Sequence, residues 1–181
     1  MSVEAHAIAP EYVEALRQIE AAQENYAVDQ ALAAARKRLS MDAAYLTTMT
    51  PREQTIDAVA GDICALGLAP GATVPIEQTY CVRMLSGEIP NVVPDTRLEP
   101  AIRDLAATRV VGAYIGVPVK LSDGRVHGTL CCASQERRAE LGAKELKFMQ
   151  VLAGILATRV EQAQGVMSGR AQSLRGRQRT G

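Results

Sequence analysis

Two alternating stretches between residues 112 and 134 dominate the hydrophobic pattern of the chain. In GAYIGVPVK and VHGTLCCAS, apolar residues occupy both sets of alternate positions, and Asp123-Gly124 stands between the two runs. Alternation in which neither face is strongly polar is typical of strands that are buried on both sides. Asp-Gly is a preferred dipeptide of the type I′ hairpin turn. The pattern therefore predicts a central antiparallel hairpin that is covered on both faces.

Two glycines interrupt this hairpin, Gly116 on the first run and Gly128 on the second. Glycine inside a strand weakens it unless something approaches the backbone closely. We therefore expect a covering helix or a ligand to lie close to these positions.

Helical periodicity marks both ends of the chain. A first run covers residues 11–24, and a second carries Val28, Leu32, Ala35 and Leu39 on one stripe, with three cationic residues, 36–38, at its end. Cations stabilise the last turn of a helix. From Ala143 onward a long helix is predicted, because apolar residues recur at helical spacing as far as residue 160. The first run is a candidate for a dimer contact, with packing on its own sheet as the alternative.

The region between the helices and the central hairpin predicts shorter elements. They are a hairpin of residues 41–50 and 53–61 around Pro51-Arg52, a loop over 65–73, a short helix over 76–85, an edge strand over 89–93, and a loop with partial helix over 98–109. This order of elements is typical of an α+β fold in which an antiparallel sheet lies between two helical layers.

Composition and charge exclude several kinds of partner. Lys plus Arg and Asp plus Glu are balanced at 20 each, so no overall field points to nucleic acid or to a membrane. The N-terminus has no secretory pattern, and no apolar run approaches a membrane span. We therefore expect a cytoplasmic protein without a membrane partner. From residue 164 the tail is basic and is predicted to be disordered, and its lack of aromatic residues disfavours a nucleic-acid contact.

The 4 cysteines do not form a zinc pattern. Cys131 and Cys132 are adjacent and must point to opposite faces of a strand. We expect the cysteines to be reduced and mostly buried, and we expect no metal site. With Trp 0 and Phe 1, the core must be largely aliphatic.

Three segments together resemble the GAF domain family of small-molecule sensors. They are TYCVRMLSGEIPNVVPDT at 79–96, YIGVPVKLSDGRVHGTLCCAS at 114–134 and KELKFMQVLAGILATRVE at 144–161. The chain is most similar to GAF modules of actinobacterial signalling proteins. The resemblance implies a GAF/PAS-like sheet of five to six strands with the N- and C-terminal helices packed on one face. It also implies an N-terminal extension and helix over 1–27, a GAF domain over 28–163 and a separate tail over 164–181.

The resemblance further implies a ligand pocket between the sheet and the segment 70–110. The candidate pocket residues are Tyr80, Cys81, Met84, Asp95, Thr96, Tyr114 and Cys131. A mostly apolar cavity with a few converging polar groups suits a small molecule, whose identity and any cofactor stay open. Each of these residues also has a structural alternative. Asp95 could cap its own turn, Cys81 could be a small buried hydrophobe, and Tyr114 could fill the core.

These expectations lead to a non-enzymatic regulatory module that binds a small molecule. It is expected to form a homodimer and to pass its signal to a separate output protein. One alternative is a free methionine sulfoxide reductase, since some GAF proteins have that activity, but residues 98–111 lack the cysteine that such enzymes carry there. Another is a dimerisation scaffold without ligand. Bilin attachment is disfavoured because Val82, not His, follows Cys81, and His127 and Cys81 are only formal haem ligands.

Overall fold

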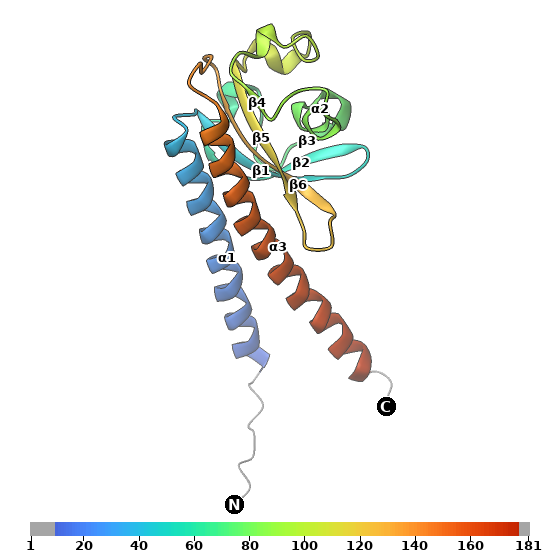
Figure 1. Ribbon diagram of the computed structural model, residues 1–181. Coiled ribbons are helices and arrows are strands. Elements are labelled where there is room, and N and C mark those ends of the chain that lie inside the picture. The colour runs from blue at the N-terminus through green and yellow to red at the C-terminus, as the bar shows by residue number, and fades with distance from the viewer. Residues whose placement is uncertain (1–9, 178–181) are drawn as a thin grey trace, which may run out of the picture.

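Six strands form one antiparallel sheet with helices on both faces (Figure 1) in this computed structural model, which describes residues 10–177. The elements are α1 (Pro10–Arg38), β1 (Ala43–Met49), β2 (Glu53–Gly61), β3 (Thr73–Pro75), α2 (Tyr80–Ser86), β4 (Val92–Val93), β5 (Ala113–Lys120), β6 (Val126–Ser134) and α3 (Ala143–Arg177). The sheet order is β3-β2-β1-β6-β5-β4, and every neighbouring pair is antiparallel. The predicted α+β class and the two covered faces of the sheet are confirmed.

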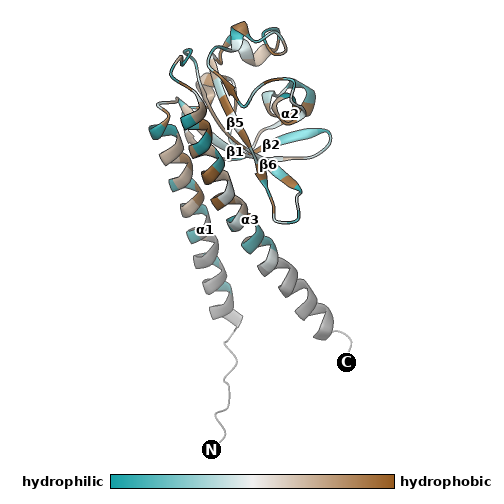
Figure 2. Cartoon of the chain, in the orientation of Figure 1, coloured by the Kyte–Doolittle hydropathy of each residue, from teal (hydrophilic) through white to brown (hydrophobic). Residues whose placement is uncertain are grey.

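Strand alternation divides the core into two apolar layers, one on each face of the sheet. The layer under α1 and α3 contains Leu32, Met149 and Leu156 from the helices and Ile115 from β5. Because neighbouring strand residues point to opposite faces, Tyr114 belongs to the other layer, under α2. Figure 2 shows hydrophobic residues on β5 and on the part of α3 that lies next to the sheet. We call the two sides of the sheet the terminal-helix face and the α2 face.

The terminal helices are longer and more continuous than the sequence pattern indicated. The two helical runs expected near the N-terminus form one helix, α1, because neither Gly nor Pro separates them. Helix α3 continues to Arg177, whereas the sequence led us to expect a separate tail from residue 164. Residues 178–181 lie outside the described part of the chain. Between residues 10 and 177, no helix is long and apolar enough to cross a membrane.

The expected helix over 76–85 is interrupted. A single 3-10 turn covers Ile76–Gln78, and α2 starts only at Tyr80. Between them Thr79 is extended, with φ −100 and ψ 148. Its hydroxyl accepts a hydrogen bond from the backbone N–H of Val82 at 3.3 Å. Threonine favours such a cap because its oxygen satisfies an N–H group that the first helical turn leaves free.

The central hairpin turns where the sequence predicted, but with a different turn. The backbone N–H of Gly124 donates to the carbonyl of Leu121 at 2.9 Å, and the N–H of Leu121 donates to the carbonyl of Arg125 at 2.8 Å. Gly124 has a φ of 88, whereas Asp123 is not in the positive-φ region. A type I′ turn needs positive φ at both central residues. The connection is therefore a three-residue loop with its glycine in the left-handed region.

Of the two short strands at the sheet edges, β4 was predicted and β3 was not. Strand β4 is an edge strand, as the prolines around it predicted, but it has only the two residues Val92 and Val93. Strand β3 lies at the opposite edge and was not predicted, because the neighbouring Gly and Pro obscure a three-residue strand.

Candidate functional site

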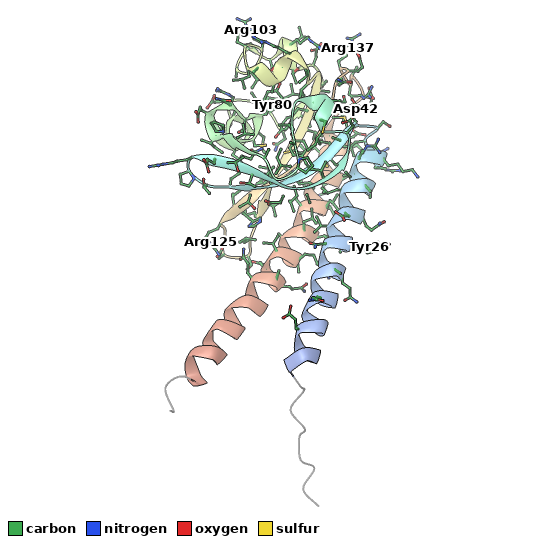
Figure 3. All side chains as sticks on the ribbon, turned by 180° about the vertical axis from the view of Figure 1, so that it is seen from behind. Tyr26, Asp42, Tyr80, Arg103, Arg125 and Arg137 are labelled. Carbon is green, nitrogen blue, oxygen red and sulfur yellow. The ribbon has the colours of Figure 1, made fainter. Side chains whose placement is uncertain are left out.

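One side of the short helix α2 packs against the sheet. Its buried residues are Tyr80, Cys81 and Met84. Residues four apart on a helix share a face, so Tyr80 and Met84 both point inward. The C-terminal Gly87 has a φ of 81, and its N–H donates to the carbonyls of the last turn. Both ends of α2 are thus capped, which holds these three buried side chains in place; Figure 3 labels Tyr80.

The α2 face of the sheet presents polar groups in the middle of an apolar layer. They come from four strands and are Tyr45 and Thr47 on β1, Gln54 on β2, Tyr114 on β5, and Thr129 and Cys131 on β6. All six side chains are buried. Buried hydroxyl, amide and thiol groups cost free energy unless they find partners, so their contacts decide what this layer can do.

Two thiols lie at the centre of these polar groups. The Sγ atoms of Cys81 and Cys131 are 3.5 Å apart. The hydroxyl of Thr129 donates to Cys81 at 3.2 Å, and the hydroxyl of Tyr114 donates to Cys81 at 3.5 Å. Thr129 in turn lies 2.8 Å from the hydroxyl of Thr47. We call Cys81, Cys131, Tyr114, Thr129 and Thr47 the thiol cluster.

The pKa values of the two thiols in the cluster are shifted in opposite directions. A hydrogen bond from Cys131 is the main cause that lowers the pKa of Cys81 to about 7, with help from Thr129, Tyr114 and Gln54 and against the effect of burial. Burial raises the pKa of Cys131 well above its usual range. Hydrogen bonds to an ionised sulfur favour the ionised form, whereas burial disfavours it. One thiolate shared by two sulfurs, centred on Cys81, is therefore the favoured ionised state of the pair.

Gln54 carries a polar atom that the fold leaves without a partner. Its side chain is 4% exposed, and its Oε1 atom accepts no hydrogen bond. Its amide is nevertheless close enough to the thiol of Cys81 to lower the pKa of that thiol. The orphaned oxygen thus lies on the α2 face beside the thiol cluster. An unsatisfied buried amide costs about 1–3 kcal/mol, so this position is unfavourable unless another group binds there.

Further hydrogen bonds attach the segment around α2 to the loop over 98–111 and to the sheet. The hydroxyl of Tyr80 lies 2.5 Å from that of Thr108, which donates to the carbonyl of Ile102 at 2.6 Å. The amide of Asn91 donates to the carbonyl of Gly116 at 2.8 Å. The rings of Tyr80 and Tyr114 meet edge to face at a centroid distance of 5.3 Å. The loop over 98–111 and helix α2 are therefore linked through the side chains of Tyr80 and Thr108.

The structure brings five of the seven predicted site residues into one layer. They are Tyr80, Cys81, Met84, Tyr114 and Cys131. The other two, Asp95 and Thr96, make local hydrogen bonds, and the Thr96 side chain also forms a hydrogen bond with Tyr80. The carboxylate of Asp95 accepts a hydrogen bond from the N–H of Arg97 at 3.1 Å and caps a turn, as its alternative reading proposed. The hydroxyl of Thr96 is buried and donates to the carbonyl of Val111 at 2.5 Å.

Sequence reasoning missed the polar residues that β1 and β2 contribute. Gln54 and Thr47 were not among the predicted site residues, although the first hairpin was predicted. A polar residue on the buried side of a strand was the available signal, but it needs the sheet order to show which groups it faces. Elsewhere, Cys64 is exposed, and His127 lies 3.4 Å from the hydroxyl of Thr48. Within residues 10–177, no group of three or more potential metal ligands occurs.

Solved structures with the same fold come from proteins of several functions. The GAF domain of an Acinetobacter phosphoenolpyruvate-protein phosphotransferase has a TM-score of 0.63 at 14% identity and covers 88% of this chain and 98% of its own. A free methionine-R-sulfoxide reductase from Neisseria meningitidis, solved with its substrate, has a TM-score of 0.63 at 20% identity. The match covers 92% of this chain and 99% of the reductase. The GAF-B domain of DevS from Mycobacterium smegmatis has a TM-score of 0.57 at 19% identity. The match covers 77% of this chain and 94% of that domain. At these identities the likeness concerns the fold alone.

Sequence comparison identifies the family more directly. No curated protein sequence matches the chain significantly. The family model described as "GAF domain" matches residues 26–160, which include the whole sheet, α2 and the part of α3 packed on the sheet. The chain therefore belongs to the GAF domain family.

Proposed function

We propose that this GAF domain is a non-catalytic sensory module that binds a small molecule between α2 and the sheet. GAF domains are generally sensory or regulatory ligand-binding modules. The observation that carries the proposal is the orphaned Oε1 of Gln54, which lies in a buried layer beside the thiols and hydroxyls. A ligand that donates a hydrogen bond to this oxygen would remove the free-energy cost of leaving it buried without a partner. The rest of the layer would enclose the apolar part of such a molecule.

The signal would leave through the terminal helices. Helices α1 and α3 pack on the opposite face of the sheet and extend beyond it, where both described ends of the chain lie (Figure 1). The sheet is the only layer between these helices and the α2 face, so a change in strand spacing on one face reaches the other. A ligand can shift such an equilibrium only by binding one arrangement more tightly than another. The output would then be a separate protein that contacts the helices.

Replacing Gln54 should separate ligand binding from folding. We expect the native mass spectrum of the purified protein to contain a small adduct that disappears on denaturation. Gln54→Met should reduce the adduct fraction about tenfold, because it removes the proposed acceptor; tenfold corresponds to about 1.4 kcal/mol. The adduct-free variant should be about 1 kcal/mol more stable than the adduct-free parent in urea unfolding, since an unsatisfied buried amide is gone.

A matched substitution at Gln150 provides the control for that experiment. Gln150 is exposed on α3, so Gln150→Met should keep the adduct and leave the stability nearly unchanged. Bare polypeptide mass in the parent, together with no gain in stability for Gln54→Met, would contradict the proposed site. That result would favour the ligand-free scaffold instead.

The dimer also belongs to this proposal. Tyr26 on α1 is 65% exposed, and Val151 and Ile155 on α3 are 55% and 53% exposed. Val151 and Ile155 lie four residues apart and so share one side of α3, while Tyr26 projects from α1 (Figure 3). Large exposed apolar side chains on the two helices that carry the signal suit a contact with a second copy of the chain.

A charge placed on this side of α3 should weaken self-association. We expect Ile155→Glu to raise the dimer dissociation constant at least about tenfold in sedimentation equilibrium, because burying a large apolar side chain stabilises by about 1.5–3 kcal/mol. Gln150→Glu adds one negative charge on a different side of the helix and should leave the constant unchanged. Equal effects of the two variants, or a parent protein that is monomeric throughout, would exclude this contact.

Methionine sulfoxide reduction is a second candidate because of the thiol pair. The chain shares its fold with such reductases, and the fold brings Cys81 and Cys131 to 3.5 Å. However, the loop over 98–111 carries no cysteine, and both paired thiols are buried, at 1% and 0% exposure. A nucleophilic cysteine needs to reach its substrate, and methionine sulfoxide, as a whole amino acid, needs a much wider opening to these sulfurs than a small peroxide does. These observations favour binding over catalysis.

A further inference from the structure

The contact between Cys81 and Cys131 is more specific than core packing requires. The residues are 50 positions apart in the sequence and come from α2 and β6, yet their Sγ atoms are 3.5 Å apart. A disulfide bond is about 2.05 Å long. The sulfurs therefore need to approach by only about 1.5 Å. Cys64 is exposed and Cys132 points to the other face of the sheet, so no other described thiol competes at this point.

Cys132 shows what a purely structural thiol looks like in the same strand. It lies on the terminal-helix face, 3.9 Å from the sulfur of Met149. Burial alone raises the pKa of Cys132 to about 12. Cys81 instead accepts hydrogen bonds from the hydroxyls of Thr129 and Tyr114. The thiolate is the nucleophilic form of cysteine, and hydroxyl donors stabilise it. Two neighbouring environments thus hold one inert thiol and one activated pair.

We propose that Cys81 and Cys131 are a redox-active dithiol that a hydroperoxide converts into an intramolecular disulfide, joining α2 to β6. This inference goes beyond the proposed ligand binding and does not depend on it. The disulfide would fix α2 on the sheet, because the bond links the first turn of α2 to a central strand. The redox state would then control access to the α2 face.

The chemistry assigns a different part to each sulfur. The Cys81 thiolate attacks one oxygen of the hydroperoxide; an S–O bond forms, the O–O bond breaks, and the alcohol or water leaves with a proton. Cys81 is then a sulfenic acid. The sulfur of Cys131 attacks the sulfur of Cys81; the S–S bond forms, the S–O bond breaks, and the oxygen leaves as water with the Cys131 proton. Two thiols and one hydroperoxide thus give one disulfide, one alcohol and one water. A dithiol reductant reverses the bond by exchange.

The test uses the whole, reduced, adduct-free protein and hydrogen peroxide as the probe. After treatment with one equivalent of peroxide and alkylation of the remaining thiols, we expect two of the 4 cysteines to be protected and to become available again after dithiothreitol. Tryptic peptides 53–83 and 126–137 should be joined. Each contains two cysteines, so fragmentation must assign the bond to Cys81 and Cys131. The same treatment in guanidinium chloride should give mixed bridges, because the fold no longer selects the pair.

Single variants provide the control. Cys64→Ser and Cys132→Ala should keep the bridge, whereas Cys81→Ala and Cys131→Ala should abolish it. Circular dichroism must show that each variant is folded, and Cys81→Ser replaces Cys81→Ala if the latter is not. The proposal is overturned if native parent protein forms no bridge, if Cys64 forms it between chains, or if Cys81 oxidises beyond sulfenic acid without a bridge. Any of these results would leave the adduct experiment with Gln54 unaffected, so the two proposals fail separately.

Discussion

Gly128→Ala should lower the free energy of unfolding by about 3 kcal/mol or prevent folding. A Cβ atom at this position would lie 1.7 Å from the backbone oxygen of Thr47 and 2.6 Å from its backbone carbon. Both atoms belong to β1, which pairs with β6 in the middle of the sheet. A backbone cannot turn away as a side chain can, so the two strands would have to separate. Separation would also break the hydrogen bond from the N–H of Thr129 to the hydroxyl of Thr47, at 3.1 Å.

The same substitution at Gly154 should have the opposite sign. Gly154 is exposed on α3, and a Cβ atom there would meet nothing within 4 Å. Alanine is favoured over glycine in a helix interior by about 1 kcal/mol, so Gly154→Ala should stabilise the protein by about that amount. Urea unfolding followed by circular dichroism measures both variants. If Gly128→Ala loses less than about 1 kcal/mol, the close approach of β1 and β6 is wrong.

Gly128 also shows how far the sequence could be interpreted. Glycine inside a strand predicted a close approach, and one exists, but it comes from the backbone of β1 and not from a helix or a ligand. At Gly116 the neighbour is the hydroxyl of Tyr114, two residues earlier on the same strand. Local patterns indicate that space is restricted at a position. Which group restricts it depends on sheet order and register, which the sequence pattern does not contain.

The elements with strong periodicity were predictable for a physical reason. Strands β5 and β6 alternate over eight or more residues, and the stripe of α3 repeats over several turns, so many residues agree on one period. Strand β3 has three residues, too few to show a period. The end of α2 toward the N-terminus was misplaced because Thr79 is compatible with a helix by composition, and only its capping geometry excludes it.

Three members of the thiol cluster, Cys81, Cys131 and Tyr114, were predicted, but their arrangement was not. Cys81 and Cys131 were both expected on the pocket side, since α2 and alternate positions of β6 face it. Their contact at 3.5 Å depends on where α2 crosses the sheet. Gln54 joins them only because β2 lies beside β1, which lies beside β6. Such long-range proximity determines the chemistry of the layer, and a single sequence carries no signal for it.

Alkaline pH should destabilise this protein unusually steeply. Burial raises the pKa values of Cys131, Cys132, Tyr45 and Tyr114 above their ordinary values. A thiol in the unfolded chain has a pKa near 9.0, whereas burial in the folded chain raises the pKa of Cys132 to about 12. Above about pH 9 the unfolded state is therefore favoured by about 1.4 kcal/mol per pH unit for each such group. The two thiols together should cost roughly 3 kcal/mol between about pH 8 and pH 10, and the tyrosines add to the loss at higher pH.

Cys81 contributes with the opposite sign and in a different window. Its folded pKa is lowered to about 7 from an ordinary 9.0, so its stabilisation grows as the pH rises from 7 to 9 and is constant above that. The steep loss above pH 9 is thus left to the groups with raised pKa values. Stability should consequently be greatest near pH 8 to 9 as far as these buried groups determine it.

Removing one buried thiol tests this explanation, because it should change the slope of stability against pH. Urea unfolding under a phosphine reductant at several pH values between 8 and 11 should show Cys132→Ala losing stability less steeply than the parent, by about 1.4 kcal/mol per pH unit above pH 9. The variant starts from a lower stability, because a small cavity replaces the sulfur beside Met149, so the two curves should converge as the pH rises. Cys64→Ser removes an exposed thiol and should run parallel to the parent. Parallel curves for Cys132→Ala as well would mean that water reaches this thiol in the folded state, contrary to its burial on the terminal-helix face.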